Sequence, residues 1–161
     1  MPPRHPALSD HPTVTDQPTM MIPDIQFSLL CEDVRREMSG NFQFLGVVAD
    51  NLVVQRLPVR FFRLNIANRW TSGEGSFKQK TAIMAPDGRT PLVTGQEIAV
   101  KLADGSRTHT TVETFLGVEF RETGTYWVEV SLDGELRMRY PFTIRIAPPR
   151  PAAPPPEAPS A

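Results

Sequence analysis

Apolar and polar residues alternate with a period of two along most of the middle of this chain. The clearest case runs from residue 124 to residue 146, where two alternating stretches flank the pair Asp133-Gly134. Alternation of this kind places one set of side chains on each face of a β-strand. The stretch therefore predicts a β-hairpin with one apolar and one polar face, and the apolar face requires a second sheet to cover it.

The register of this hairpin follows from the same pattern. A two-residue turn would place Leu132 opposite Glu135 and mix apolar with charged side chains on one face. A three-residue loop, or a bulge of equivalent count, instead places Leu132 opposite Leu136 and leaves Glu129 facing Arg139 on the polar side. We expect this second register, because burying large apolar side chains stabilises more than an exposed ion pair does. The further pairs that it predicts are Val130 with Met138 and Tyr126 with Phe142.

Eight stretches of the chain carry the pattern of a strand, and none carries the spacing of an amphipathic helix. Turn signals such as Pro86-Asp87-Gly88 separate them. Short strands at regular spacing without helices favour an all-β, antiparallel two-sheet sandwich, with a closed barrel as the alternative. The expected strands span residues 25–33, 42–49, 62–70, 77–85, 98–102, 110–120, 126–132 and 136–146.

Within the longer strands the alternation also predicts which side chains point outward. Phe62 falls on the inner face of its strand, which turns Phe61 outward at the start of that strand. The same reasoning turns Phe115 and Trp127 outward on two later strands. Outward aromatic side chains on a sheet are typical of contact surfaces, or are covered by other parts of the chain, here the N-terminal arm or loops, and the sequence leaves both open. Together with Arg139, these three aromatic residues form the candidate interface.

The two ends of the chain differ in composition from the middle. Residues 1–23 carry many prolines among small and polar residues, and residues 148–161 are mostly proline and alanine. Such segments lack the periodic apolar positions of a folded element and favour extended, flexible conformations. We therefore expect one β domain over residues 24–147, between a flexible Pro-rich arm and a disordered tail.

Charge and cysteine content narrow the range of partners. The formal net charge is −1, which gives no reason to expect nucleic acid or an anionic membrane as a partner. No apolar run approaches the length of a membrane-spanning helix, and the first residues lack the apolar stretch of a secretory signal. Cys31 is the only cysteine, so the chain has no internal disulfide. These features predict a cytoplasmic protein.

The residues that could carry chemistry form no recognisable catalytic or metal-binding pattern. Cys31 lies at an inner position of its strand with no histidine near it in sequence, and we expect a small core residue rather than a reactive thiol. A metal site built from His5, His11 and neighbouring aspartates matches no strong ligand spacing. His109 is expected to be a polar residue that opens a strand. We therefore expect no enzyme activity, no cofactor and no metal.

The densest charged cluster spans residues 32–37 and leaves two interpretations open. In the first, the cluster is a binding patch in which Asp33 pairs with Arg35 or with another base. In the second, the strand ends at Asp33, and the carboxylate caps a turn or accepts backbone N–H bonds. The second interpretation is the one we favour.

The segment just before the hairpin carries a resemblance to a known fold. Residues 122–126, Glu-Thr-Gly-Thr-Tyr, resemble the turn into a late strand of immunoglobulin-type sandwiches, where a tyrosine forms a tyrosine corner. Val128 stands where antibody domains carry a cysteine, so the inter-sheet disulfide of those domains is absent. The resemblance implies an immunoglobulin-like sandwich with Greek-key connections.

Several motifs together resemble a family of small bacterial proteins of unknown function. They are LLCEDVRRE (29–37), GN (40–41), FLGV (44–47), GTY (124–126) and DG (133–134). The resemblance spans residues 25–146 and leaves both ends outside. It implies one self-contained β domain and supplies no catalytic residues.

The sequence thus predicts a non-enzymatic binding or assembly module that acts through protein–protein contacts or self-association. The candidate interface consists of Trp127, Phe115, Phe61 and Arg139. The alternative function is a small-ligand or carbohydrate-binding module built on the same fold.

Overall fold

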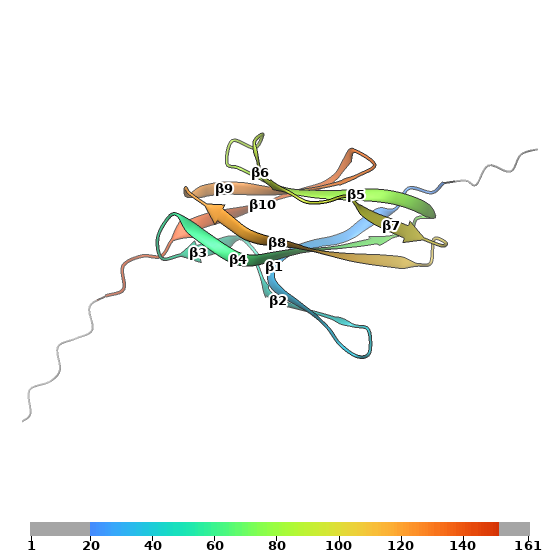
Figure 1. The fold of residues 1–161 in the computed structure, drawn as a ribbon, viewed down its shortest axis with the longest axis horizontal. Coiled ribbons are helices and arrows are strands. Elements are labelled where there is room, and N and C mark those ends of the chain that lie inside the picture. Colours follow the sequence, from blue (N-terminus) through green and yellow to red (C-terminus); the bar gives the residue numbers. More distant parts are fainter. Residues whose placement is uncertain (1–19, 152–161) are drawn as a thin grey trace, which may run out of the picture.

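The computed structural model describes residues 20–151 of the chain. These residues form ten strands and the turns that connect them (Figure 1). None of these residues forms a helix that could cross a membrane. Turn residues separate the strands, as the composition predicts. The strands are β1 (Asp24–Arg36), β2 (Phe42–Val47), β3 (Asn51–Val54), β4 (Val59–Thr71), β5 (Gly75–Met84), β6 (Pro91–Thr94), β7 (Ile98–Leu102), β8 (Thr108–Phe120), β9 (Gly124–Leu132) and β10 (Glu135–Ile146).

The strands form two sheets that face each other as two layers (Figure 1). The four-stranded sheet has the order β2-β1-β4-β8, and the six-stranded sheet has the order β3-β10-β9-β5-β6, with β7 also paired to β5. The prediction of an all-β protein with two sheets is confirmed. The expected number of about eight strands is too low, because the four-residue strands β3 and β6 escape a search for alternation. The pairing is not wholly antiparallel either, because β3 runs parallel to β10.

Large apolar side chains from both sheets fill the space between the layers. Phe120 of the four-stranded sheet is fully buried and contacts Tyr126 and Phe142 of the six-stranded sheet edge to face, at ring-centroid distances of 5.0 and 6.0 Å. Aromatic pairs in this arrangement stabilise a core beyond the area that they bury. The Tyr126 hydroxyl donates a hydrogen bond of 3.0 Å to the backbone oxygen of Glu122. This bond ties the start of β9 to the turn that precedes it.

A small polar network crosses the core beside these rings. The Trp70 indole Nε1 donates to Gln79 Oε1 over 2.7 Å, and the Thr111 hydroxyl donates to the same oxygen over 2.9 Å. Trp70 and Gln79 are both completely buried. A buried amide oxygen that accepts two hydrogen bonds avoids the cost of an unsatisfied polar group. The network joins β4, β8 and β5, and thus links the two sheets.

Glu113 of β8 is the one buried carboxylate among residues 20–151, with 9% of its surface exposed. Its Oε2 has no hydrogen-bond partner among these residues. Burial raises the pKa of Glu113 above the usual value of 4.5, while the Gln96 amide and the Thr81 side chain partly offset that rise. Ionised Glu113 is therefore a source of instability in the folded protein at neutral pH.

Replacing Glu113 with Gln should raise the free energy of unfolding at pH 7. A pKa that is raised on folding stabilises the folded state below the unfolded value of 4.5, and this contribution is lost as the pH rises through the folded pKa. Urea unfolding of the wild type and the variant measures the difference in their free energies of unfolding, and comparing this difference at pH 4 and pH 7 isolates the effect of Glu113. Equal stability of the two proteins at both pH values would contradict the prediction.

The paired strands β4 and β8 reverse their facing part of the way along. Phe61 lies opposite Val118 and Leu64 lies opposite Phe115, and both pairs point toward the core. Strict alternation forbids this, because three positions separate the two pairs on each strand. The irregularity lies between the pairs, at Gly117, whose φ of 65° falls in the left-handed region that favours glycine. The predicted inner and outer faces are therefore wrong in β8 before Gly117, where Phe115 points inward, and at the start of β4, where Phe61 points inward.

Strand β1 contains a similar irregularity. Its register with β4 shifts between Ile25 and Phe27. As a result, Leu30 packs in the core together with Ile25. Phe27 and Leu29, which the same alternation as for Cys31 places at inner positions, do not join the core cluster. Cys31 is fully buried, as expected. Because it follows Leu30 directly in the strand, its side chain points to the other face of the sheet, away from the core between the sheets.

The β9–β10 hairpin combines the two registers that the sequence suggests. Asp133 and Gly134 form a two-residue turn, so Leu132 pairs with Glu135, and the expected pairing of Leu132 with Leu136 is wrong. A register shift around Arg137 then corrects the count. Beyond it the expected pairs are confirmed, namely Val130 with Met138, Glu129 with Arg139 and Tyr126 with Phe142.

The β1–β2 hairpin leaves the sheet to which it belongs. β1 pairs with β4 only as far as Cys31, whereas its pairing with β2 continues to Arg36. In Figure 1 the end of this hairpin extends away from both layers. Near the chain's first described residues, Met21 bridges to Glu74 and Pro23 packs against Gly73, so these residues of the expected arm contact the domain. Residues 148–151, at the start of the expected tail, belong to no strand. The rest of the two ends, residues 1–19 and 152–161, lies outside the described residues.

Candidate functional site

Two members of the candidate interface, Trp127 of β9 and Arg139 of β10, lie together on the outer face of the six-stranded sheet. The Arg139 guanidinium sits 4.4 Å from the centre of the Trp127 ring, a cation–π geometry. Arg139 also pairs with Glu129 at 3.4 Å and donates to the backbone oxygen of Gly88 at 3.2 Å. Trp127 is half-buried in this arrangement. One ring face is thus already occupied by a side chain of the protein itself.

The other two members do not point outward. Phe115 is 4% exposed and belongs to the core cluster. Phe61 is half-buried and packs edge to face against Phe120, with ring centroids 5.7 Å apart. The reversal at Gly117 places both residues on the inner side, so the expectation that they point outward is wrong.

The side chains that the structure exposes in their place are their neighbours in sequence. Phe62 of β4 is 84% exposed, and Leu116 of β8 is 69% exposed. Arg63, next to Phe62, lies directly opposite Leu116 in the register. A signal for this was present in the sequence, since an isolated glycine inside a long alternating strand indicates a bulge.

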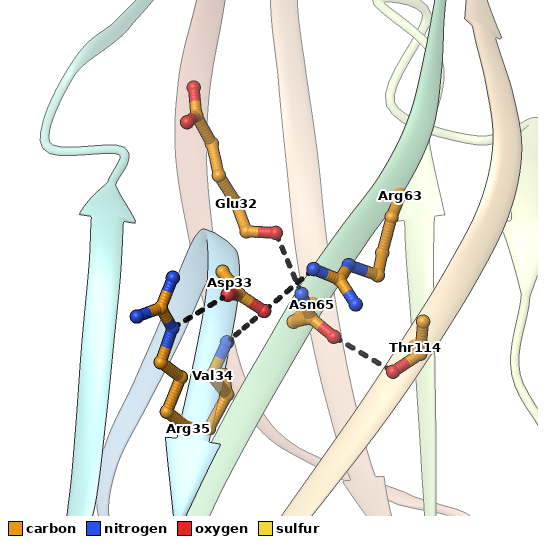
Figure 2. Close-up of polar contacts among 7 residues, drawn as sticks. All are labelled: Glu32, Asp33, Val34, Arg35, Arg63, Asn65 and Thr114. Carbon is orange, nitrogen blue, oxygen red and sulfur yellow. Dashed lines mark hydrogen bonds and ion pairs between the residues drawn. The ribbon is translucent and has the colours of Figure 1, made fainter.

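A fixed polar cluster lies beside these apolar side chains on the four-stranded sheet. Figure 2 shows the Asp33 carboxylate held between two arginines, with Arg63 at 2.7 Å and Arg35 at 3.2 Å. Asp33 also accepts a hydrogen bond of 3.0 Å from the Val34 amide. The bond from Arg35, supported by Arg63 and Val34, holds the pKa of Asp33 below its ordinary value. Asp33 thus accepts a backbone N–H, as the second interpretation predicts, and pairs with two bases, as the first predicts. The expectation that the strand ends at Asp33 is wrong, because β1 continues to Arg36.

The cluster continues across the sheet through Asn65. Its Nδ2 donates to the backbone oxygen of Glu32 at 2.9 Å, and its Oδ1 accepts a hydrogen bond of 2.8 Å from the Thr114 hydroxyl (Figure 2). Asn65 is nearly fully buried. These bonds connect β1, β4 and β8 and fix the polar side chains in place. We call the surface formed by Phe62, Leu116, Asp33, Arg63 and Thr114 the outer patch.

The next residues to consider are those whose side chains could react or bind a metal, namely the cysteine and the histidines. Burial, together with the nearby Asp33 carboxylate, raises the pKa of the Cys31 thiol to about 11, which disfavours the reactive thiolate. The His109 Nδ1 lies 3.2 Å from the backbone nitrogen of Lys101 and 3.1 Å from its backbone oxygen, so the ring is bound to the backbone of Lys101. Among residues 20–151 no group of three or more histidine, cysteine or acidic side chains is arranged to hold a metal. His5 and His11 lie outside the described residues.

Comparison with known proteins gives a family without an assigned activity. A family model described as a family of unknown function (DUF6941) matches residues 26–145. A search of curated proteins gives no match.

Two solved structures illustrate how distant the structural neighbours are. One is the Pseudomonas fluorescens alkylpurine DNA glycosylase AlkC bound to DNA containing an abasic site analog, with 12% identity and a TM-score of 0.40 over 59% of this chain and 27% of that one. The other is β-glucosidase 3B from Thermotoga neapolitana in complex with glucose, with 15% identity and a TM-score of 0.41 over 74% of this chain and 16% of that one. The chain thus corresponds to a small part of each, and neither likeness identifies its function.

Proposed function

The chain belongs to the family of unknown function DUF6941, and from this premise we propose that it is a non-enzymatic binding module that acts through protein–protein contacts. The observation that carries the proposal is the outer patch, where Phe62 and Leu116 are 84% and 69% exposed. Large apolar side chains that gather on the surface of a folded domain commonly mark an interaction site. The partner is a second protein, either a different chain or another copy of this one.

The polar part of the outer patch supports the same function. Asp33, Arg63 and Thr114 are held by hydrogen bonds within the domain, so a partner would meet them in fixed positions. Fixed polar groups lose little side-chain entropy on association and restrict which partners fit. An apolar centre with such a border has the composition of a protein–protein interface.

We propose further that the fold is an immunoglobulin-like sandwich with Greek-key connections. Three features support this assignment: β3 runs parallel to β10, the order β10-β9-β5 continues the same sheet, and β4 pairs with β1 and β8 in the other. The hydrogen bond from Tyr126 to Glu122 is the bond of a tyrosine corner, at the entrance to the strand where such domains have it. Domains of this class often serve as contact modules, which is an argument from analogy.

The same proposal covers where the module works and what it does not bind. A net charge of −1 offers no general attraction to nucleic acid or to anionic membranes. A lone, buried Cys31 accords with a reducing compartment, and we place the protein in the cytoplasm. A bacterial source, which the sequence motifs suggest, remains a prediction.

A double variant of the outer patch tests the function. Phe62→Ser with Leu116→Ser should weaken association about thirtyfold, the effect of losing a binding hot spot of about 2 kcal/mol. Gel filtration with light scattering measures self-association, and quantitative pull-down from the native source measures binding to another protein. Since both side chains are exposed, the variant should keep the wild-type unfolding midpoint.

Two further variants separate the outer patch from other surfaces. Leu136→Ser removes an exposed leucine of the six-stranded sheet and should leave association unchanged. Trp127→Ala tests the opposite face, and a loss of binding there, with the double variant unaffected, would move the interface to Trp127 and Arg139. A protein that stays monomeric and captures no partner sensitive to either change would overturn the proposed function.

A further inference from the structure

A hollow lies where the β1–β2 hairpin projects from the four-stranded sheet, on the face opposite to Trp127. It has a volume of about 670 Å³, within the range of small-molecule sites. Arg36, Phe42 and Phe44 line it from the hairpin. Phe27 and Arg69 line it from the sheet, together with the start of β8. The hollow thus depends on the departure of the hairpin from the sheet.

One wall of the hollow is aromatic. Phe27 meets Phe44 edge to face with ring centroids 5.8 Å apart, although the two residues come from different strands. Phe42 stacks beside Phe44 at 6.1 Å. None of the three rings belongs to the core cluster between the sheets. They therefore offer a preformed apolar surface to a molecule that enters the hollow.

The charged groups of the hollow are two arginines. Arg69 donates through a terminal nitrogen to the Thr108 hydroxyl at 3.4 Å, and its Nε is buried without a hydrogen-bond partner among residues 20–151. The Arg36 guanidinium lies 5.7 Å from the centre of the Phe42 ring. Neither arginine forms an ion pair with a carboxylate of the described part of the chain, and no carboxylate lines the hollow.

We propose that this hollow binds a small organic anion, a carboxylate or phosphate attached to an apolar or aromatic body. The anionic group pairs with Arg36 and Arg69, because guanidinium groups match carboxylate and phosphate oxygens in geometry and charge. The body of the ligand packs against Phe27, Phe42 and Phe44. An anion matches the charge of the two guanidinium groups that line the hollow, whereas a neutral or cationic ligand leaves both positive groups unmatched. This site is independent of the outer patch.

Binding of matched probe molecules to the full chain tests this assignment. Benzoate and phenyl phosphate carry the two anions on the same ring, benzyl alcohol lacks the charge, and inorganic phosphate lacks the ring. Two-dimensional NMR titration should show saturable shifts at the amides of residues 108–110 and 42–44 with benzoate or phenyl phosphate. Benzyl alcohol and inorganic phosphate should each bind at least tenfold more weakly. The preferred anion distinguishes a carboxylate ligand from a phosphorylated one.

Variants of the arginines identify the binding groups. Arg36→Gln and Arg69→Gln should each weaken the better probe about tenfold or more, the effect of losing one charged hydrogen bond. Arg35→Gln makes the same change of charge one residue away, on a side chain that does not line the hollow, and should leave the affinity unchanged. Because Arg36 lies in the projecting hairpin, its variant stays informative even if Arg69→Gln reduces the stability of the sheet.

Three outcomes would overturn the proposal. The first is equal affinity for benzyl alcohol and benzoate, which would make the hollow a purely apolar site. The second is binding of benzoate and phenyl phosphate that neither Arg36→Gln nor Arg69→Gln weakens. The third is the absence of saturable shifts at the lining residues with every probe.

Discussion

Replacing Trp70 with Ala should lower the free energy of unfolding by about 3–5 kcal/mol. The indole is completely buried between the sheets, so its removal leaves a cavity in the core. The substitution also removes the 2.7 Å hydrogen bond from Nε1 to Gln79, whose side chain is itself fully buried. Both the cavity and the weakened network act in the same direction.

Far-UV circular dichroism in urea measures this effect without depending on tryptophan fluorescence. The midpoint should fall while the dependence on urea concentration stays the same, because the folded state keeps its surface. Trp70→Phe keeps a ring but loses the donor, and should cost less than Trp70→Ala. Trp127→Ala removes the half-buried tryptophan of the outer face and serves as the matched control. Equal losses from Trp70→Ala and Trp127→Ala would contradict the central place of the polar network.

Replacing Gly117 with Val should cost about 1–3 kcal/mol, because a β-branched residue is strained at the φ of 65° that this position has. Space is not the obstacle, since a Cβ at this position would meet only the Arg60 side chain, at 3.6 Å or more. If the strand relieved the strain by restoring strict alternation, Phe62 and Leu116 would lose their exposed positions. Association through the outer patch should then weaken together with stability.

The effect of Gly117→Val can be separated from that of losing any glycine. Gly105→Val is the control, because the φ of Gly105 lies outside the left-handed region and no atom lies within 4 Å of an added Cβ. Gly117→Asn should lose less stability than Gly117→Val, since asparagine tolerates the left-handed region. Urea unfolding of the three variants measures the order. A Gly117→Val protein as stable as Gly105→Val would show that the reversal of β4 and β8 does not require this conformation.

The sequence predicts strands well wherever alternation is uninterrupted. The β9–β10 hairpin is an example, because burial of Val130 and Tyr126 fixes the pairs beyond the turn whatever the turn itself does. The three-residue loop does not form, since Asp133-Gly134 makes a two-residue turn, and the predicted alternative, a bulge of equivalent count, occurs at Arg137. The pattern specifies the final register and does not specify where the correction occurs.

Facing was predicted wrongly where an irregularity interrupts a strand. The break in alternation at Gly117 turns Phe61 and Phe115 toward the core. It exposes the neighbouring residues Phe62 and Leu116. The Trp127 and Arg139 contact was foreseeable, because Arg139 and Glu129 already face each other in the predicted register. The hollow beneath the β1–β2 hairpin was not foreseeable, because Phe27 and Phe44 meet only when that hairpin leaves the sheet. Contacts of this kind depend on tertiary geometry that no periodicity encodes.

The parallel pairing of β3 with β10 has a consequence for how the chain folds. Asn51 pairs with Thr143, and Val54 pairs with Ile146. The backbone groups of β3 that form these pairs therefore stay unpaired until β10, the last strand of the chain, has been made. During synthesis on the ribosome, β3 therefore has no partner until nearly the whole domain has left the exit tunnel. Such pairing between distant segments slows folding, because the loop between them must close before the contacts stabilise it. A chain halted before residue 143 would therefore leave the β3 strand without the partner that covers its edge in the folded domain.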